Sequence, residues 1–419
     1  MARILILTSD IAEAAQIRRI KSLRSLGHEV TSAGFRRANM NPAFQPDWPH
    51  LHVCNIGNGG MGARCAALAR ACARLLPRCG RLGAPELILA RNLDMLALAV
   101  ALRPLLPGRP AIVYECLDIH GSLTAHGPAA AMLRRVERWL LRRIALLVTS
   151  SPGFLRSYFG PVQRHAGPTH LLENRLAGDE LPARPRMRPD SPNGPSSPVR
   201  PDCPVGPDGP DGPARPPLVL GWVGSIRCAP SLALLADLAR RMGPDLQIRI
   251  SGAVHMHAVP DFPATLARHP NLIWTGAYRY PDDLAGIYAG CDLVWAQDLW
   301  QRGANSDWLL PNRIYEAGYF GCPAIAVDGT ETARRIQRDG LGFTIPRPDA
   351  SDLAGLLTGL DRAAIAAASS AILARPTGQF RENTGDLERM VQLALRGDIA
   401  RAAPRAALPG PPADRGEAA

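Results

Sequence analysis

The segment from Trp308 to Ala326 combines a helix start with an arginine and a glutamate. Pro311 is typical of a first helical turn, and the pattern after it predicts a helix over Asn312 to Tyr319. Free amide groups and the positive end of the helix dipole attract an anion at such a place. Arg313 is unfavourable beside that dipole unless an anion joins it, so it indicates a bound phosphate, and Glu316 can accept hydrogen bonds from a diol such as ribose. An ordinary cap with a surface Arg and Glu is the alternative.

A second polar group follows predicted strands in the first half of the chain. Asp118 and His120 lie just past a strand predicted over Ala111 to Glu115. A carboxylate and an imidazole are common choices for orienting or deprotonating a hydroxyl. Arg91 and Asn92 follow another predicted strand and are candidates for binding hydroxyls or a phosphate. The structural alternatives are a capping Asp with a surface His, and a helix cap at Asn92.

Short apolar runs alternate with helical patterns, which predicts parallel sheets covered by helices on both faces. In the first half, the predicted strands are Arg3 to Leu7, Glu29 to Gly34, Leu51 to Ile56, Leu87 to Ala90, Ala111 to Glu115, Leu146 to Thr149 and Thr169 to Leu172. In the second half, they are Leu218 to Val223, Gln247 to Ser251, Leu272 to Thr275, Leu293 to Ala296 and Ala324 to Val327. The fold class is therefore α/β, with two doubly wound, Rossmann-like domains. Ligands of such sheets bind beyond the carboxyl ends of the strands, so we expect the substrates in a cleft between the domains.

The composition divides the chain into these domains. Residues 182–217 hold 13 Pro and 4 Gly, which predicts an extended or disordered linker. The linker separates a first domain over 1–181 from a second over 218–400. Residues 401–419, rich in Ala, Pro and Arg, are expected to form a disordered tail.

Charge and cysteine content narrow the classes of function. A formal net charge of +11 suits a phosphate-bearing substrate, an anionic membrane or nucleic acid, but only 5% of the residues are aromatic and no helix-turn-helix pattern occurs. Nine Cys without a C-x-x-C spacing indicate neither a zinc cluster nor a disulfide framework. No signal peptide is evident, and no apolar run reaches the roughly 18 residues of a membrane span. We therefore expect a cytoplasmic protein that binds no nucleic acid and no metal.

An arginine-rich run extends from Leu133 to Arg143, with Trp139 and leucines opposite the arginines. A helix of this kind can rest on an anionic membrane, so peripheral contact with the inner face is one expectation. A solvated helix face packed on its own sheet is the alternative.

A literal G-x-G-x-x-G occurs at Gly57 to Gly62 and formally matches a dinucleotide fingerprint. It follows the third predicted strand, and no acidic residue ends a strand about 20 residues further on. We interpret it as a glycine-rich turn that shapes the cleft. An NAD(P)-dependent oxidoreductase remains an alternative function, as does a non-catalytic, basic nucleic-acid-binding or scaffold protein.

The run from Glu316 through Gly321 to Pro323 resembles the donor-binding motif of family 4 glycosyltransferases, which have the GT-B fold. The resemblance extends in outline over both domains and implies that they face each other across a cleft. In this family, a loop after the first strand of the second domain contacts the donor diphosphate. The matching positions here are Gly224, Ser225 and Arg227, while Tyr278 and Arg279 fall in the region that receives the nucleotide base.

Two positions depart from the family pattern. Its paired-glutamate motif has a Glu eight residues before Glu316, where this chain has Trp308. Its phosphate-binding Lys, five residues after the arginine of the loop, falls at Leu232.

Some members carry Pro-Asn-Lys at the helix start instead, and this chain has a similar Pro-Asn-Arg. The resemblance therefore assigns Asn312 and Arg313 to the donor. Asn305, Ser306 and Asp307 are the candidates for contacts with the donor sugar.

The resemblance implies transfer of a sugar from a nucleotide-diphosphate donor to a polysaccharide, lipid-linked or other glycoconjugate acceptor, with retention of configuration. Two guanidiniums and helix-start amides can neutralise the departing diphosphate without a metal, and no cofactor is expected besides the nucleotide-sugar co-substrate. The implied catalytic residues are Asp118, His120, Arg227, Arg313 and Glu316. The predicted acceptor-binding residues are Arg91, Asn92, Asp118 and His120.

Overall fold

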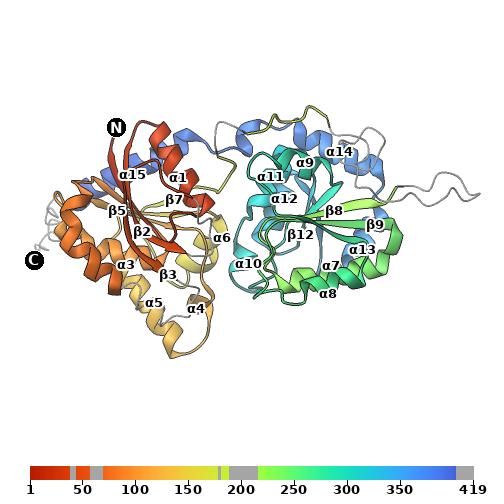
Figure 1. Cartoon of the computed structure of the whole chain (residues 1–419), viewed down its shortest axis with the longest axis horizontal. Coiled ribbons are helices and arrows are strands. Elements are labelled where there is room, and N and C mark those ends of the chain that lie inside the picture. Colours follow the sequence, from red (N-terminus) through yellow and green to blue (C-terminus); the bar gives the residue numbers. More distant parts are fainter. Residues whose placement is uncertain (38–43, 57–68, 178–180, 188–215, 403–419) are drawn as a thin grey trace, which may run out of the picture.

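The protein forms two α/β domains that lie side by side in a computed structural model (Figure 1). The structure describes residues 1–37, 44–56, 69–177, 181–187 and 216–402. The Gly57 to Gly62 motif and most of the linker predicted over 182–217 lie outside these residues, as does the tail after Ala402.

The first domain contains a seven-stranded sheet in the order β3-β2-β1-β4-β5-β6-β7, and every pairing in it is parallel. Strands β1, β4, β5 and β6 are almost completely buried, as expected for a sheet covered on both faces. The strands are β1 (Arg3–Thr8), β2 (Glu29–Arg37), β3 (His50–Ile56), β4 (Leu87–Arg91), β5 (Ala111–Cys116), β6 (Leu146–Thr149) and β7 (Thr169–Leu171).

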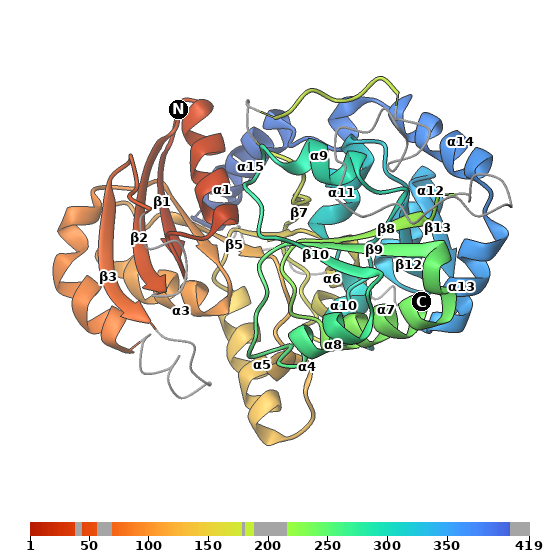
Figure 2. The same cartoon turned by 45° about the vertical axis from the view of Figure 1, so that its right-hand side comes forward.

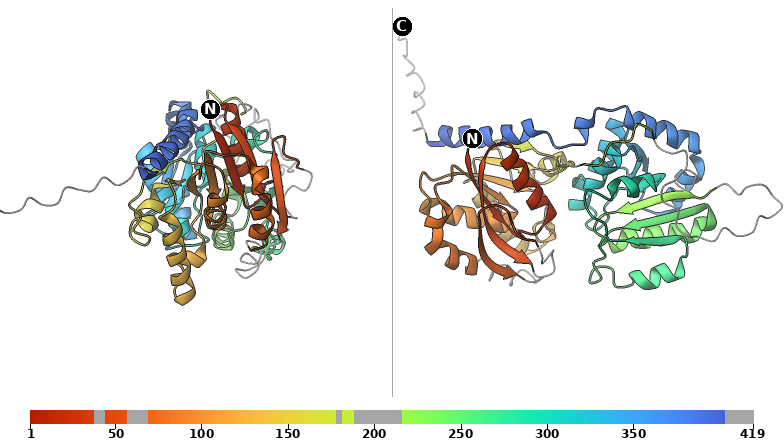
Figure 3. Two further views of the ribbon diagram at one scale, coloured as in Figure 1. Left: turned by 90° about the vertical axis from the view of Figure 1, so that its left-hand side faces the viewer. Right: turned by 45° about the horizontal axis from the view of Figure 1, so that its top comes forward.

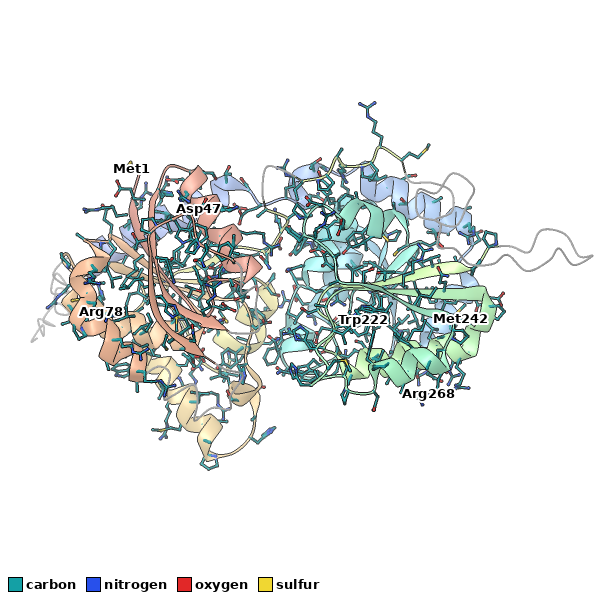
Figure 4. The ribbon with its side chains drawn as sticks, in the orientation of Figure 1. Met1, Asp47, Arg78, Trp222, Met242 and Arg268 are labelled. Atoms are coloured by element: carbon teal, nitrogen blue, oxygen red, sulfur yellow. The ribbon has the colours of Figure 1, made fainter. Side chains whose placement is uncertain are left out.

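The second domain contains a six-stranded parallel sheet in the order β10-β9-β8-β11-β12-β13. Trp222 on β8 is buried inside this domain (Figure 4). The strands are β8 (Leu218–Val223), β9 (Leu246–Ser251), β10 (Leu272–Gly276), β11 (Leu293–Trp295), β12 (Ala324–Val327) and β13 (Gly342–Ile345).

Helices cover both faces of each sheet (Figures 1 and 2). In the first domain, they are α1 (Ala14–Ser25), α3 (Leu93–Leu102), α4 (Gly121–Thr124), α5 (Pro128–Leu141) and α6 (Pro152–Phe154). After the linker, they are α7 (Ala229–Met242), α8 (Phe262–Arg268), α9 (Leu284–Ala289), α10 (Asn305–Trp308), α11 (Asn312–Tyr319), α12 (Glu331–Asp339), α13 (Ala350–Gly359), α14 (Arg362–Leu373) and α15 (Thr384–Ala402). Among the described helices, no single one is long and apolar enough to cross a membrane, and α13 with α14 meets that test only as a pair bent by 92°.

The predicted strands are confirmed with ends displaced by at most a few residues, but the sequence pattern missed β13. This strand has only four residues and begins at Gly342. A Cβ atom on Gly342 would lie 2.0 Å from the carbonyl oxygen of Ala324 on β12. The absence of a side chain at Gly342 therefore allows this segment to approach β12 closely and join the sheet.

The last helix, α15, follows the second domain in the chain but packs against β4, β5 and β6 of the first domain. It returns to the first domain and lies along it (Figure 3). Leu387, Met390 and Val391 of α15 share a buried cluster with Ile4 and Ile6 of β1. The hydrophobic face of α15 is thus stabilised by contacts with β1, which lies more than 300 residues earlier in the chain.

A buried ion-pair network anchors this returning segment. Arg19 on α1 pairs with Glu382, just before α15, and at 3.0 Å with Glu115 on β5. Glu115 also pairs with Arg91 at 2.9 Å. The two guanidiniums hold the pKa of the buried Glu115 carboxyl below its usual value against the effect of burial. Removing one member would leave uncompensated charge in the core.

A second buried carboxyl lies on the inner face of α5. Glu137 is fully buried and accepts hydrogen bonds from the hydroxyls of Tyr114 and Tyr158 and from the amide of Gln163. Burial raises the pKa of Glu137 to about 7 although these three hydrogen bonds favour the ionised form. The domain therefore contains a carboxyl that changes its charge near neutral pH.

We predict that Glu137 makes the free energy of unfolding decrease as the pH rises from about 4.5 to about 7. Its pKa is higher in the folded chain than the 4.5 of an unperturbed glutamate, so the folded state binds more protons across this window. The loss amounts to about 3 kcal/mol at most. Urea unfolding of the wild type and of Glu137→Gln at pH 5 and pH 8 measures it. An equal pH dependence in both proteins would contradict the prediction.

Candidate active site

Helix α11 places Glu316 where the two domains meet. The helix spans the predicted residues, with Pro311 as its N-cap. Glu316 is only 7% exposed, and the hydroxyl of Tyr288 on α9 donates a 2.8 Å hydrogen bond to its Oε2. Burial raises the pKa of Glu316, while Tyr288, Arg18 and Arg313 favour its ionised form. The carboxylate can therefore remain an acceptor for a diol.

Arg313 lies beside the loop that follows β8. Its Nη1 donates a 3.3 Å hydrogen bond to the carbonyl of Trp295 at the end of β11. A Cβ atom on Gly224 would lie 3.8 Å from Nη2 of Arg313, and Gly224 has a φ of +118° that favours glycine. The structure thus brings together Arg313, Glu316 and this loop, as the sequence predicted.

Arg227 and Ser225 are exposed on the same loop. Burial raises the pKa of Asp118 in the first domain and lowers that of His255 in the second, and the positive charge of Arg227 opposes the first shift and adds to the second. Two cations therefore lie at this loop. Arg227 belongs to the loop and acts on Asp118, while Arg313 of α11 approaches the loop at Gly224. Two guanidiniums arranged in this way can hold a diphosphate between the domains.

Asp118 lies at the cleft edge of the first domain and contacts the second. Asn305 at the start of α10 donates a 3.2 Å hydrogen bond from Nδ2 to Asp118, and its Oδ1 accepts a 2.8 Å bond from the amide of Ile119. Partial desolvation by the surrounding protein raises the pKa of Asp118, against the effects of Asn305 and then Arg227, but the side chain is exposed and solvent weakens this effect. Asp298, which the sequence did not indicate, also raises this pKa.

His120 is the N-cap of the short helix α4, whereas the structural alternative gave a capping role to Asp118. Its Nδ1 accepts a 3.2 Å hydrogen bond from the amide of Ser122 and lies 2.9 Å from the Ser122 hydroxyl. The ring is therefore oriented by α4, and its side chain is exposed two residues after Asp118. Its part in catalysis stays a prediction.

The structure does not place Arg91 at the cleft as the sequence suggested, while the acceptor role of Asn92 stays a prediction. Arg91 is completely buried by its ion pair with Glu115, and its Nη1 donates a 2.8 Å bond to the carbonyl of Ala15. Asn92 occupies the N-cap position of α3 without a side-chain cap, and its Nδ2 lies 3.5 Å from the hydroxyl of Ser9. Arg91 is thus held inside the domain because the sheet buries the carboxylate that it neutralises.

The three candidates for the donor sugar separate in the structure. Only Asn305 reaches across to the first domain. Ser306 is buried and bonds to Asp298 and to the amide of Gln301, while Asp307 accepts a 2.8 Å bond from the amide of Gly303 and pairs with Arg302. The side chains of Ser306 and Asp307 therefore stabilise the loop over residues 298–307.

The region expected to receive the base forms a cavity of about 410 Å³ beyond the ends of β9 and β10. Tyr278 lines it together with Ser251 and Thr275. Arg279 does not line the cavity, because it is exposed and pairs with Asp283 at 3.2 Å.

Three further contacts between the domains were not anticipated. Asn312 at the start of α11 accepts a 2.7 Å hydrogen bond from Asn174, and Arg335 forms a buried ion pair with Glu173. Arg18 of α1 lies over the ring of Tyr280 at 4.6 Å. The sequence gives no sign that these residues contact one another, since each pair joins segments far apart in the chain. Among the described residues, no group of three or more His, Cys, Asp or Glu could hold a metal ion.

Comparisons with known proteins agree with this arrangement. Residues 18–175 match the family model "Glycosyl transferase 4-like domain". The chain is 36% identical to the succinoglycan biosynthesis protein ExoL of Rhizobium meliloti over 393 residues, which is 94% of this chain and 93% of that protein. A structure of Anabaena HepE in complex with UDP and glucose matches with a TM-score of 0.62 at 18% identity, covering 96% of this chain and 99% of that one.

The fold is shared with further enzymes. Sucrose-phosphate synthase from Thermosynechococcus elongatus matches with a TM-score of 0.63 at 14% identity, covering 96% of this chain and 98% of that one. These matches show the fold, and the similarity to ExoL over nearly the whole of both chains shows the family. The chain therefore belongs to the glycosyltransferase 4-like family and is a glycosyltransferase with the GT-B fold.

Proposed function

We propose that this glycosyltransferase moves a sugar from a nucleotide-diphosphate donor to a growing polysaccharide or to a lipid-linked or other glycoconjugate acceptor. The observation that carries the proposal is the buried Glu316 beside Arg313, with Arg227 on the adjoining loop. The names of ExoL, a succinoglycan biosynthesis protein, and of HepE bound to UDP and glucose support a role in polysaccharide assembly with such a donor.

The chemistry assigned to these residues follows from their charges. Sugar transfer releases a nucleoside diphosphate, and Arg227 and Arg313 stabilise the negative charge that develops on it. Glu316 accepts hydrogen bonds from the ribose hydroxyls. We propose that the transfer needs no metal, since these guanidiniums and the amides at the start of α11 supply the positive charge. We also propose that it retains configuration, as the resemblance to family 4 implies.

On the acceptor side, we assign the main role to Asp118. It faces the same loop as the donor phosphates, because Arg227 acts on its carboxylate. Its carboxylate is exposed at the junction, so an acceptor hydroxyl can reach it. Asp118 orients the acceptor hydroxyl, and Asn305 fixes the carboxylate.

Binding of UDP and GDP, measured by calorimetry, tests the donor site. Arg227→Ala and Glu316→Ala should each weaken binding of the preferred nucleotide by about 1–3 kcal/mol, because each removes charged hydrogen-bonding groups. Arg241→Ala on α7, where Arg241 is exposed and pairs with Asp237, should leave the affinity unchanged. Unaltered affinity in both site variants would refute the donor site.

Turnover of Asp118→Asn tests the acceptor side. This variant keeps the size of the side chain but loses its charge, so kcat should fall about 10²–10⁴-fold with little change in nucleotide affinity. His120→Ala should have a smaller effect because its ring caps α4. A wild-type rate in Asp118→Asn would remove this residue from catalysis.

We propose further that the enzyme works in the cytoplasm, at the inner face of an anionic membrane. The seven cysteines of the described part are free thiols, which suits a reducing compartment. Helix α5 projects with α4 from the lower edge of the first domain (Figures 1 and 2). Its outer face carries Met132, Val136 and Trp139, which are 64%, 38% and 49% exposed.

Cations accompany this apolar face. Arg135 and Arg142 are exposed on α5 and after it, and Arg143 lies 3.4 Å over the ring of Trp139. An amphipathic surface of this composition suits the boundary between anionic headgroups and acyl chains. The exposure of Trp139 supports this proposal, while Leu140 and Leu141 on the opposite face pack α5 on its own sheet.

Sedimentation with vesicles tests this surface. The wild type should bind vesicles that contain anionic phospholipid, and Met132→Gln with Trp139→Gln should weaken that binding at least about tenfold, since both remove apolar area. Met256→Gln, which changes an exposed methionine of the second domain, serves as the control. Equal binding by all three proteins would contradict the assignment of α5.

A further inference from the structure

Arg18 on α1 extends from the first domain to the second. Its guanidinium lies 4.6 Å over the ring of Tyr280 and donates a hydrogen bond to the hydroxyl of that residue. The side chain of Arg18 is half-buried, and Tyr280 belongs to the segment between β10 and α9. The chemistry assigned above uses Arg227 and Arg313 and leaves Arg18 without a task.

The ring that Arg18 covers packs close to the carboxylate that is proposed to hold the ribose. Tyr280 packs against a buried cluster that includes Tyr288 of α9 and Ile314 of α11. Glu316 lies two residues after Ile314 in the same helix and accepts a 2.8 Å hydrogen bond from Tyr288. The guanidinium of Arg18 is near enough to this carboxylate for its charge to favour the ionised form.

Several titratable and charged groups face this carboxylate. They are Arg18 from α1, Arg313 from α11 itself, Tyr288 from α9, and Tyr278 and Tyr280 from the segment before α9. Burial raises the pKa of each of the three tyrosines, so all three stay neutral at the pH of an assay. Within this set, Glu316 is therefore the group that changes its charge, and Arg18 and Arg313 oppose its protonation.

A bound donor changes the balance between these two cations. In the proposed reaction Arg313 faces the diphosphate, whose negative charge offsets that of its guanidinium. The same phosphates repel an ionised Glu316 and so favour its protonation. With a donor in the site, Arg18 is thus the cation that is left to keep Glu316 ionised.

The helix that carries Arg18 is fixed where the chain crosses between the domains. The amide of Leu176 donates a 3.0 Å hydrogen bond to the carbonyl of Phe380, and the amide of Glu382 donates a 2.7 Å bond to the carbonyl of Leu176. The side chain of Glu382 in turn accepts a 2.5 Å bond from the hydroxyl of Ser22 on α1. Both crossing segments therefore hold α1 in place, and with it the position of Arg18 over Tyr280.

We propose that Arg18 is a positioning residue of the donor site, which keeps the Glu316 carboxylate charged for the ribose while the diphosphate occupies Arg313. The inference rests on the proposed function and deepens it, because recognition of the ribose by the second domain then depends on a side chain of the first. An ionised carboxylate accepts hydrogen bonds from both hydroxyls of the diol, whereas a protonated one offers fewer and weaker acceptor sites.

Binding of a nucleoside diphosphate and of its 2′,3′-dideoxy analogue tests the proposal. The full chain is titrated by calorimetry with UDP and GDP, and the tighter of the two is compared with its analogue between about pH 5 and pH 8. The ratio of the two affinities isolates the contact with the diol, since both ligands carry the same phosphates, which themselves titrate near about pH 6. In the wild type this ratio should fall as acid protonates Glu316.

Arg18→Gln should raise the pH at which half of this preference for the diol is lost by about one unit, because the carboxylate loses an opposite charge. On the acid side, the preference should be up to about tenfold weaker than in the wild type at the same pH. Arg18→Lys keeps the charge and should restore the wild-type midpoint. Arg24→Gln, which removes an arginine of the same helix from its exposed pair with Asp47, is the control and should match the wild type.

Two results would overturn the role of Arg18. The first is an equal midpoint in the wild type and Arg18→Gln, even where thermal melting shows a less stable variant, because the contact over Tyr280 would then serve only the junction. The second is a raised midpoint that Arg18→Lys does not restore, since charge would not be the cause.

Failure of the proposed function gives a different result. A wild type that binds the nucleotide without any preference for the diol would refute the ribose contact of Glu316, and the role of Arg18 with it. A preference that the wild type shows and Glu316→Gln loses supports that contact, whatever the Arg18 variants do.

Discussion

The buried carboxylate of Glu316 sets the main constraint on this structure. A carboxylate removed from water is unstable unless donors and cations compensate for the lost solvation. Here the hydroxyl of Tyr288 and the charges of Arg18 and Arg313 provide that compensation. These groups come from α9, α1 and α11, so both domains contribute to the surroundings of one buried carboxyl group.

This constraint connects the site with the junction of the domains. Arg18 reaches the second domain over the ring of Tyr280, and Asn305 reaches the first through Asp118 and Ile119. Glu173 and Arg335 add a buried ion pair. A change in the relative position of the domains would therefore alter the surroundings of both Glu316 and Asp118, which links donor binding to the geometry on the acceptor side.

The positive charge of the chain is divided among distinct tasks. Arg19 and Arg91 neutralise the buried Glu115 inside the first domain, while Arg227 and Arg313 stand at the cleft. Arg36 and Arg74 act together on the pKa of His52 on β3, which burial lowers first. Net charge alone does not distinguish these tasks, because its effect depends on burial and on the nearest carboxylate.

The sequence by itself determined the elements and the type of site. Alternating apolar runs predicted twelve of the thirteen strands, and Pro311 with the pattern after it predicted the bounds of α11, because these signals are local. The spacing of Arg313 and Glu316 within one helix also identified a candidate for the donor site, since residues three apart lie on the same face.

Only the tertiary structure decided which polar residues face the cleft. The sequence suggested that Arg91 binds a ligand, but in the structure it is buried and pairs with Glu115. Ser306 likewise bonds to Asp298 in its own loop instead of facing the cleft. The approach of Arg18 to Glu316 and the return of α15 to the first domain join segments about 300 residues or more apart. Such contacts depend on how whole domains pack, and no local pattern of residue types encodes that packing.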